Sequence, residues 1–135
     1  MDIIIGGIMK LEELNIYNLS MELGDKSWEV VNHWDYFLKD TIGKQLIRAV
    51  DSVAANISEG FGRYHFNEAK HFVYYARGSL YETKTWLTKA YNRKLISEIL
   101  FNEFINDINN LGVKLNNYIK SIGKQKSLKQ QSDHE

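Results

Sequence analysis

The 135-residue sequence contains no cysteine and no proline. Without cysteine, disulfides and thiolate metal sites are excluded. Without proline, no residue lacks the backbone N–H that a helix needs, so long helices can run uninterrupted. The formal net charge is also zero. The whole chain therefore offers no electrostatic reason to expect a nucleic-acid partner.

Charge is nevertheless distributed unevenly along the chain. Residues 1–66 hold six Lys and Arg against ten Asp and Glu, whereas residues 67–135 hold eleven against seven. The net charge is therefore −4 in the first part and +4 in the second. The second part is therefore the place to look for the binding surface of an anionic partner.

The two ends differ in composition from the middle. The start, MDIIIGGIMK, is a short apolar run that is broken by two glycines and lacks the basic beginning of a signal peptide. We expect residues 1–10 to form a flexible leader, with Met1 and Met9 both open as the true start. Residues 124–135 are almost free of apolar side chains and are predicted to be a disordered tail. No run is long and apolar enough to span a bilayer, which predicts a cytoplasmic protein without membrane contact.

Between these ends, in residues 11–123, apolar residues recur at helical spacing in four stretches. The pattern predicts helices over 12–33, from an N-cap at Asp40 or Thr41 to Gly60, over 66–91, and from an N-cap at Ser97 to Gly123. No stretch has the alternation of a strand. The expected fold is all-α, an antiparallel up-down four-helix bundle.

Each predicted helix carries one apolar face. In the first helix this face holds Leu14, Tyr17, Met21, Trp28 and Val31. The faces of the other three comprise Ile42, Leu46, Ala49, Val50, Val53 and Ile57; then Ala69, Phe72, Val73, Ala76, Leu80, Thr83, Leu87 and Ala90; then Leu100, Phe104, Ile108, Leu111, Leu115, Tyr118 and Ile122.

The segment NISEGFGR, residues 56–63, joins the second helix to the third. Its backbone N–H groups, ahead of a helix, could hold a phosphate. However, the Gly-x-Gly pattern has no preceding strand, no third glycine and no Lys-Ser/Thr, so it resembles neither a dinucleotide fingerprint nor a Walker loop. The favoured interpretation is structural: Gly60 ends the helix in a left-handed conformation, Gly62 permits the reversal and Phe61 closes the core.

Charged residues surround this corner. Arg48 and Glu59 lie three helical turns apart on one face, where an unpaired charge near the core is costly. We expect pairing with Arg63 or Arg77, and a catalytic role for Glu59 is the less favoured alternative. The predicted structural corner and ion-pair network comprises Arg48, Asn56, Glu59, Gly60, Gly62 and Arg63.

The third helix carries a second, basic and aromatic stripe beside its apolar face. Three interpretations are open: a subunit interface, which favours Tyr and Arg; an ordinary solvated flank; or a surface for single-stranded RNA. Small residues within the stripe would let another helix approach closely. This candidate oligomer or RNA surface comprises Lys70, Tyr74, Arg77, Gly78, Ser79, Tyr81, Lys84, Arg93 and Lys94.

Residues for enzyme chemistry are scattered. His33, His65, His71 and His134 form no helical pair, and no inward-facing set of glutamates indicates a di-metal site. We predict a protein that is not an enzyme, with no catalytic or metal-binding residues, no cofactor and no small-molecule substrate.

Two segments, GKQLIRAVDSVAANISEGFGR and FVYYARGSLYETKTWL, resemble the four-helix-bundle family of 23S rRNA intervening-sequence proteins. More distantly, they are similar to the accessory variability determinant of diversity-generating retroelements. The resemblance runs from about Leu11 to Ile122 and rests on Gln45, Arg48-Ala49, Ser52, Asn56-Ile57, Glu59-Gly60, Gly62-Arg63, Ala76, Gly78-Ser79 and Glu82.

This resemblance implies a homopentameric ring of up-down bundles without known enzymatic activity. Through the retroelement branch it implies RNA and a reverse transcriptase as partners. The chain departs from the pattern at His65, where a serine usually caps the third helix; if His65 does not accept the capping bond, the cap is weaker by about 1 kcal/mol. It is also neutral where the retroelement accessory is basic, which lowers the expectation of salt-sensitive RNA binding.

The leading hypothesis is therefore a non-enzymatic, pentameric scaffold. The alternative is an RNA-binding accessory, with tyrosines of the third helix stacking on bases and lysines and arginines contacting phosphates.

Overall fold

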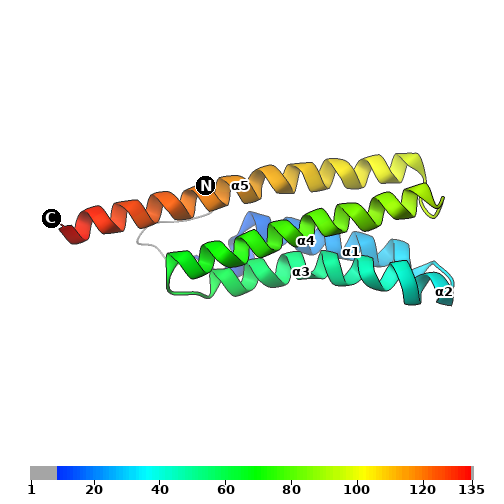
Figure 1. The fold of residues 1–135 in the computed structure, drawn as a ribbon, viewed down its shortest axis with the longest axis horizontal. Helices are drawn as coiled ribbons and strands as arrows, with labels where there is room; N and C mark the ends of the chain where they lie inside the picture. Colours follow the sequence, from blue (N-terminus) through cyan, green and yellow to red (C-terminus); the bar gives the residue numbers. More distant parts are fainter. Residues whose placement is uncertain (1–8, 135) are drawn as a thin grey trace.

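The computed structural model describes residues 9–134 as a bundle of four long helices, with no strand in that range (Figure 1). The elements are the 3-10 helix η1 (Leu11–Glu13), α1 (Asn15–Asn32), the short α2 (Tyr36–Leu38), the π-helix η2 (Lys39–Gly43), α3 (Lys44–Phe61), α4 (Phe66–Asn92) and α5 (Glu98–His134). The predicted up-down bundle is confirmed. The predicted leader lies largely outside the described residues.

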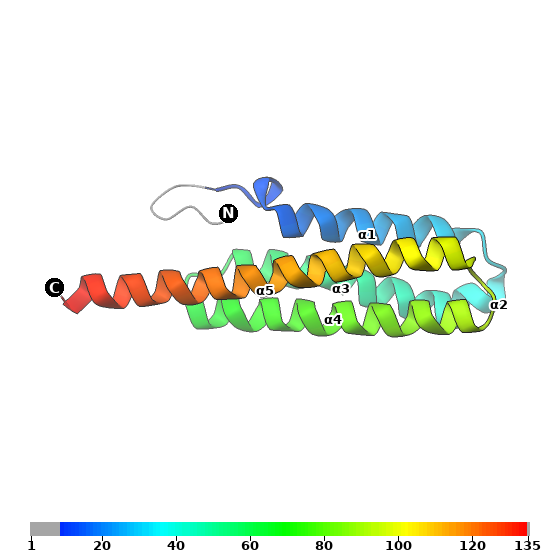
Figure 2. The ribbon, with the colours of Figure 1, turned by 90° about the horizontal axis from the view of Figure 1, so that it is seen from above.

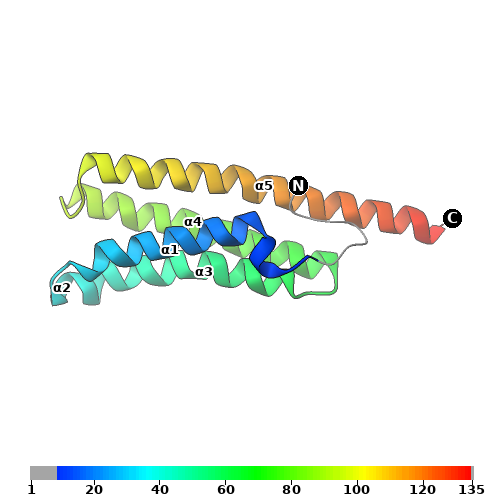
Figure 3. The ribbon, with the colours of Figure 1, turned by 180° about the vertical axis from the view of Figure 1, so that it is seen from behind.

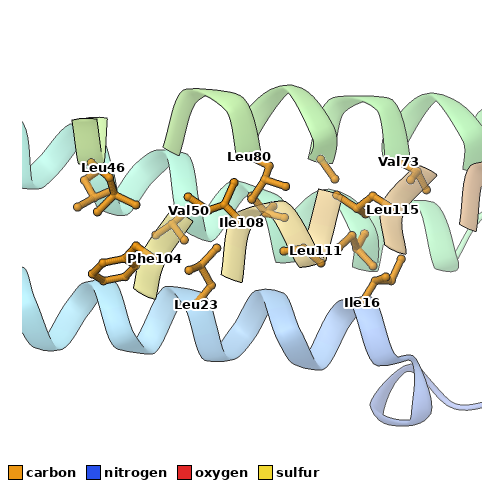
Figure 4. Close-up of a cluster of buried hydrophobic side chains, with 14 of the residues drawn as sticks. Ile16, Leu23, Leu46, Val50, Val73, Leu80, Phe104, Ile108, Leu111 and Leu115 are labelled. Atoms are coloured by element: carbon orange, nitrogen blue, oxygen red, sulfur yellow. The ribbon is translucent and has the colours of Figure 1, made fainter. Parts of the chain in front are cut away.

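The helices pack in a closed cycle, because α3 contacts α1 and α4, and α5 contacts α4 and α1. The short α2 and the α4–α5 turn lie at one end of the bundle, and the α3–α4 corner lies toward the other (Figures 1 and 3). The core runs between the four helices along the bundle (Figure 4). It includes Ile16, Leu46, Val50, Leu87, Phe104, Leu111 and Leu115, all fully buried.

The third predicted helix is confirmed nearly to the residue, and Ser97 caps α5 as predicted. The Ser97 hydroxyl oxygen accepts a hydrogen bond of 3.1 Å from the N–H of Leu100. His65 precedes α4 without a side-chain cap bond, as its departure from the usual serine indicated. The whole predicted stripe of the second helix is buried. Most of the apolar residues predicted for α4 and α5 are buried as well.

The predicted start of the second helix is wrong. The carboxylate of Asp35 accepts a hydrogen bond of 3.0 Å from the N–H of Leu38, so the helical path begins at Tyr36 and continues through η2 into α3. Asp40 and Thr41 therefore lie inside a helix. The sequence did not show this because the wider turns of a π-helix break the 3.6-residue period.

The predicted face of the first helix is wrong in part. Met21 and Trp28 are 44% and 56% exposed, whereas Ser20 and Ser27 are buried. Each serine hydroxyl donates to the carbonyl one turn earlier, to Ile16 at 2.6 Å and Leu23 at 2.8 Å. Serines that satisfy their own hydroxyls can enter the core at little cost. The helix is consequently rotated so that Met21 and Trp28 lie on its exposed side.

The end of the chain also differs from its prediction as a disordered tail. Gly123 does not stop the last helix, and α5 continues to His134, past the ends of the other helices (Figure 2). Two contacts hold its first extra turns to the α3–α4 corner. The Lys126 ammonium donates to the Asn67 side chain at 2.8 Å, and Lys129 lies over the ring of Tyr64 at 5.4 Å.

Candidate functional site

The α3–α4 corner is built by close contact between backbones. Gly60 is buried inside α3, and a Cβ at this position would lie 3.0 Å from both the Ala69 carbonyl oxygen and the Phe72 Cβ. The prediction that Gly60 is a left-handed helix end is therefore wrong. Its role is to let α4 approach α3, and the helix ends one residue later, at Phe61.

The backbone N–H groups that follow Gly60 already have acceptors. Gly62, with a φ of −78°, donates to the Ser58 carbonyl at 3.2 Å, and Arg63 donates to the Gly60 carbonyl at 3.2 Å. These bonds close the last turn of α3. The two N–H groups are thus not available to an anion, which favours the structural interpretation of the corner.

Only part of the predicted ion-pair network comes together. Arg63 pairs with Glu59 one turn earlier, and its guanidinium lies 4.8 Å from the centre of the Phe72 ring. Asn56 donates instead to the Ser52 carbonyl at 2.8 Å. Arg48 lies three turns away, toward the α2 end, and it joins no ion pair among the side chains of residues 9–131.

The stripe on α4 borders a groove between α4 and α5. The groove has a volume of about 290 Å³, and its lining includes Arg77, Tyr81 and Lys84 from α4 and Val113 and Asn116 from α5. Arg77 donates to the side-chain oxygen of Asn116 at 3.0 Å and lies 4.8 Å from the Tyr74 ring centre. Tyr81 is 66% exposed and Val113 61%. We call this space the α4–α5 groove.

The other predicted members of this surface are spread along α4. A Cβ at Gly78 would have no atom within 4 Å, so no helix of the same chain closes on it. Lys70 is half-buried near the start of α4, whereas Arg93 and Lys94 form the turn after it. At 1.5 Å per residue, Lys70 and Lys94 are about 36 Å apart. These residues therefore belong to one face but not to one site.

Lys94 has a left-handed backbone, with a φ of 62°. The N–H of Lys94 donates to the Tyr91 carbonyl at 3.0 Å, and the N–H of Leu95 donates to the Ala90 carbonyl at 2.9 Å. This pair of bonds is a Schellman motif, in which the left-handed position is usually glycine.

The family is decided by a match over most of the bundle. Residues 12–117 match the family model described as 23S rRNA-intervening sequence protein. The chain belongs to this family. The matched range contains the corner and the α4–α5 groove, and it stops before the part of α5 that extends beyond the bundle.

A crystal structure shares the fold of this intervening-sequence family member. It is that of a protein of unknown function from the S23 ribosomal protein family of Bacteroides thetaiotaomicron, with a TM-score of 0.70 and 21% identity. The similarity covers 78% of this chain and 98% of the other. A comparison with curated proteins gives no match.

The part of the chain that the structure describes contains neither a cluster of metal-ligating side chains nor a helix that could span a membrane. No group of three or more His, Asp or Glu side chains gathers there as a metal site would require. No helix there is long and apolar enough to cross a membrane.

A pair of carboxylates that no sequence motif indicates, Asp25 and Asp51, lies between α1 and α3. Burial, and then the nearby charge of Asp25, raise the pKa of Asp51 above its usual 3.8. Gly24 on α1 leaves room for the Asp51 side chain of α3, because a Cβ at position 24 would lie 2.9 Å from an oxygen of Asp51. Only the packing of α1 on α3 brings the two acids together, so no local pattern could have indicated them.

Proposed function

We propose that this intervening-sequence protein is a non-enzymatic scaffold that assembles with copies of itself, in the pentamer that the family resemblance implies. The α4–α5 groove is the proposed contact. The supporting observation is the exposure of Tyr81 and Val113 on either side of a hollow with an arginine at its edge. Tyrosine and arginine are enriched where subunits meet, and exposed apolar side chains around a groove gain most from being covered.

The open space at Gly78 supports the same surface. A glycine in the middle of a helix costs about 1 kcal/mol relative to alanine. Within the described chain no neighbour makes use of the missing side chain. A helix of a second copy can approach the backbone closely there.

Light scattering at micromolar concentration tests the assembly. The expected mass is five times the 15.8 kDa of one chain, and a monomer contradicts the proposal. Tyr81→Asp is expected to lower the mass by placing a charge in the contact. Tyr36→Asp is the control, because Tyr36 is 81% exposed and lies in α2 at the end of the bundle, away from both the groove and Gly78. Equal effects of the two variants would refute this surface as the contact.

An RNA-binding accessory is the second candidate, and the observation in its favour is the pairing of cations with an exposed ring in the same groove. Arg77 and Lys84 would contact phosphates and Tyr81 or Tyr74 would stack on bases. In this alternative, a reverse transcriptase is the protein partner that the resemblance implies.

Binding of single-stranded RNA, measured across a salt series, tests this candidate. We expect Arg77→Gln combined with Lys84→Gln to weaken binding at low salt at least tenfold and to flatten its salt dependence. Lys120→Gln with Lys124→Gln removes the same charge from exposed positions of α5 and should have little effect. Absence of binding at low salt, or equal losses in both double variants, rejects the RNA role.

A further inference from the structure

A second hollow lies at the α2 end of the bundle, away from the α4–α5 groove. It has a volume of about 300 Å³ and is bordered by the last turns of α1, by η2 and by the first turns of α3. Its apolar lining comes from Trp28, Val31 and Ile47. This size is at the lower end of what small-molecule pockets occupy. We call it the α2-end pocket.

The π-helix shapes one wall of this pocket. Gly43, its last residue, is buried, and a Cβ there would lie 2.7 Å from Val31 Cγ1 and 3.0 Å from the Leu38 carbonyl oxygen. Only glycine fits this position without a shift of neighbouring atoms. Short π-helical segments in otherwise regular helices are frequent at functional sites. Here the segment brings Lys39 and Gly43 to the pocket wall.

The charged residues that line the α2-end pocket have one sign. Lys39, Lys44 and Arg48 belong to its lining, and no acidic residue does. Among the side chains of residues 9–131, none of these three cations takes part in an ion pair, in contrast to Lys26, which contacts Glu103 and Asp107, and to Arg63. The fold thus leaves three cationic residues at the border of an apolar hollow without an ion-pair partner among the described side chains.

We propose that the α2-end pocket binds a small amphipathic anion. The ligand has a flat or branched apolar body, which packs against Trp28, Val31 and Ile47. It has one phosphate, carboxylate or sulfonate group, which Lys39, Lys44 and Arg48 hold. A guanidinium can contact two oxygens of such a group at once, and the apolar surroundings strengthen the attraction. The proposal is independent of the α4–α5 groove and of the assembly proposed above.

A pair of fluorescent probes distinguishes binding of the apolar body of the ligand from binding of its anionic group. Anilinonaphthalene sulfonate has an aromatic body and one anionic group, and phenylnaphthylamine has the same body without the charge. We expect the native chain to bind the sulfonate at least tenfold more tightly at low salt. The indole N–H resonance of Trp28 should shift on binding, and that of the half-buried Trp86 should not.

Variants locate the site. Lys44→Gln with Arg48→Gln should remove the preference for the sulfonate while binding of the neutral probe persists. Lys89→Gln with Arg93→Gln removes a lysine and an arginine at the same spacing, from an exposed position in the last turn of α4 and from the turn after it, and should keep the preference. Trp28→Ala should weaken both probes. Because the Trp28 side chain is 56% exposed, this variant is expected to stay folded, which circular dichroism checks.

Several results would overturn the proposal. Equal affinity for the two probes would remove the role of the cations, and so would a charge preference that survives Lys44→Gln with Arg48→Gln. An unshifted Trp28 resonance would place the probe elsewhere. If the sulfonate binds only under conditions that dissociate the assembly, a second copy covers the pocket and the ligand assignment is wrong.

Discussion

At the scale of single residues, the turn between α4 and α5 contains a residue type that is unfavourable for its backbone conformation. Lys94 occupies a left-handed position, which costs a side chain with a Cβ about 1–2 kcal/mol relative to glycine. We expect Lys94→Gly to raise the free energy of unfolding by about 1 kcal/mol, after the greater freedom of glycine in the unfolded chain is subtracted. Urea denaturation measures the change.

The neighbouring residue provides the control for this variant. Arg93 has a φ of −90°, where glycine brings no relief, so Arg93→Gly should not stabilise the protein. A gain from Arg93→Gly as large as that from Lys94→Gly would show that the effect arises elsewhere, for example from removal of a positive charge.

Asp51 makes stability depend on pH. Because its pKa is raised in the folded chain, chiefly by burial and then by Asp25, the folded state disfavours the carboxylate. The resulting destabilisation is fully present above the folded-state pKa, shrinks as the pH falls through it, and vanishes below the unfolded value of 3.8. We expect Asp51→Asn to raise the urea midpoint at pH 7 and to lose this advantage as the pH approaches 3.8.

Asp25→Asn serves as the comparison for Asp51. It removes the smaller of the two causes, so it should raise the midpoint at pH 7 by less than Asp51→Asn does. A lower midpoint for Asp51→Asn at pH 7 would contradict the direction of the pKa shift.

At the scale of elements, the extension of α5 gives a testable departure from what composition suggests. Lys126 and Lys129 tie its first extra turns to the α3–α4 corner. We expect amide hydrogen exchange to be slower in residues 124–130 than in residues 131–134. Replacing both lysines by alanine should speed exchange in the first of these segments and leave the bundle unchanged.

Hydrogen exchange can also contradict the helical extension of α5. Exchange at random-coil rates throughout residues 124–134 of the native chain would restore the disordered tail that the sequence predicts. Lys120→Ala is the control, because Lys120 is exposed on α5 within the bundle and should leave exchange in the extension unaltered.

The helices themselves were largely predictable, for a physical reason. α4 spans Phe66–Asn92 against a predicted 66–91, because its apolar residues recur at one helical period. The rotation of α1 was not predictable in the same way. It depends on buried serines that bond their own helix, whereas counting hydrophobic residues favours Met21 and Trp28.

In the candidate sites too, contacts within one helix were predictable from the sequence and contacts between helices were not. The pair between Glu59 and Arg63 is local, four residues apart on one helix, and the sequence indicated it. The bond from Arg77 to Asn116 joins two helices across 39 positions of sequence. The α2-end pocket depends on the rotation of α1, which places Trp28 beside Lys44 of α3. Such contacts follow from tertiary packing and leave no trace in local spacing.

At the scale of the whole molecule, the absence of proline has a kinetic consequence. Slow refolding phases of tens of seconds usually come from proline isomerisation, and bundles with local contacts fold within milliseconds. We expect refolding from urea at nanomolar concentration to lack such a slow phase. Any slower phase at micromolar concentration should scale with protein concentration, as assembly of copies requires. A slow phase independent of concentration would contradict this expectation.

The extension of α5 beyond the bundle makes the molecule different at its two ends. Residues 124–134 continue α5 for about 16 Å on the side away from the α2-end pocket, and only the turns after Lys129 lie beyond the contacts with the α3–α4 corner. A dye or fused domain placed at the tip of this helix is held off the body by a built-in spacer. The same protein can therefore be attached to a surface through its C-terminal end while the pocket at the opposite end stays open to solution.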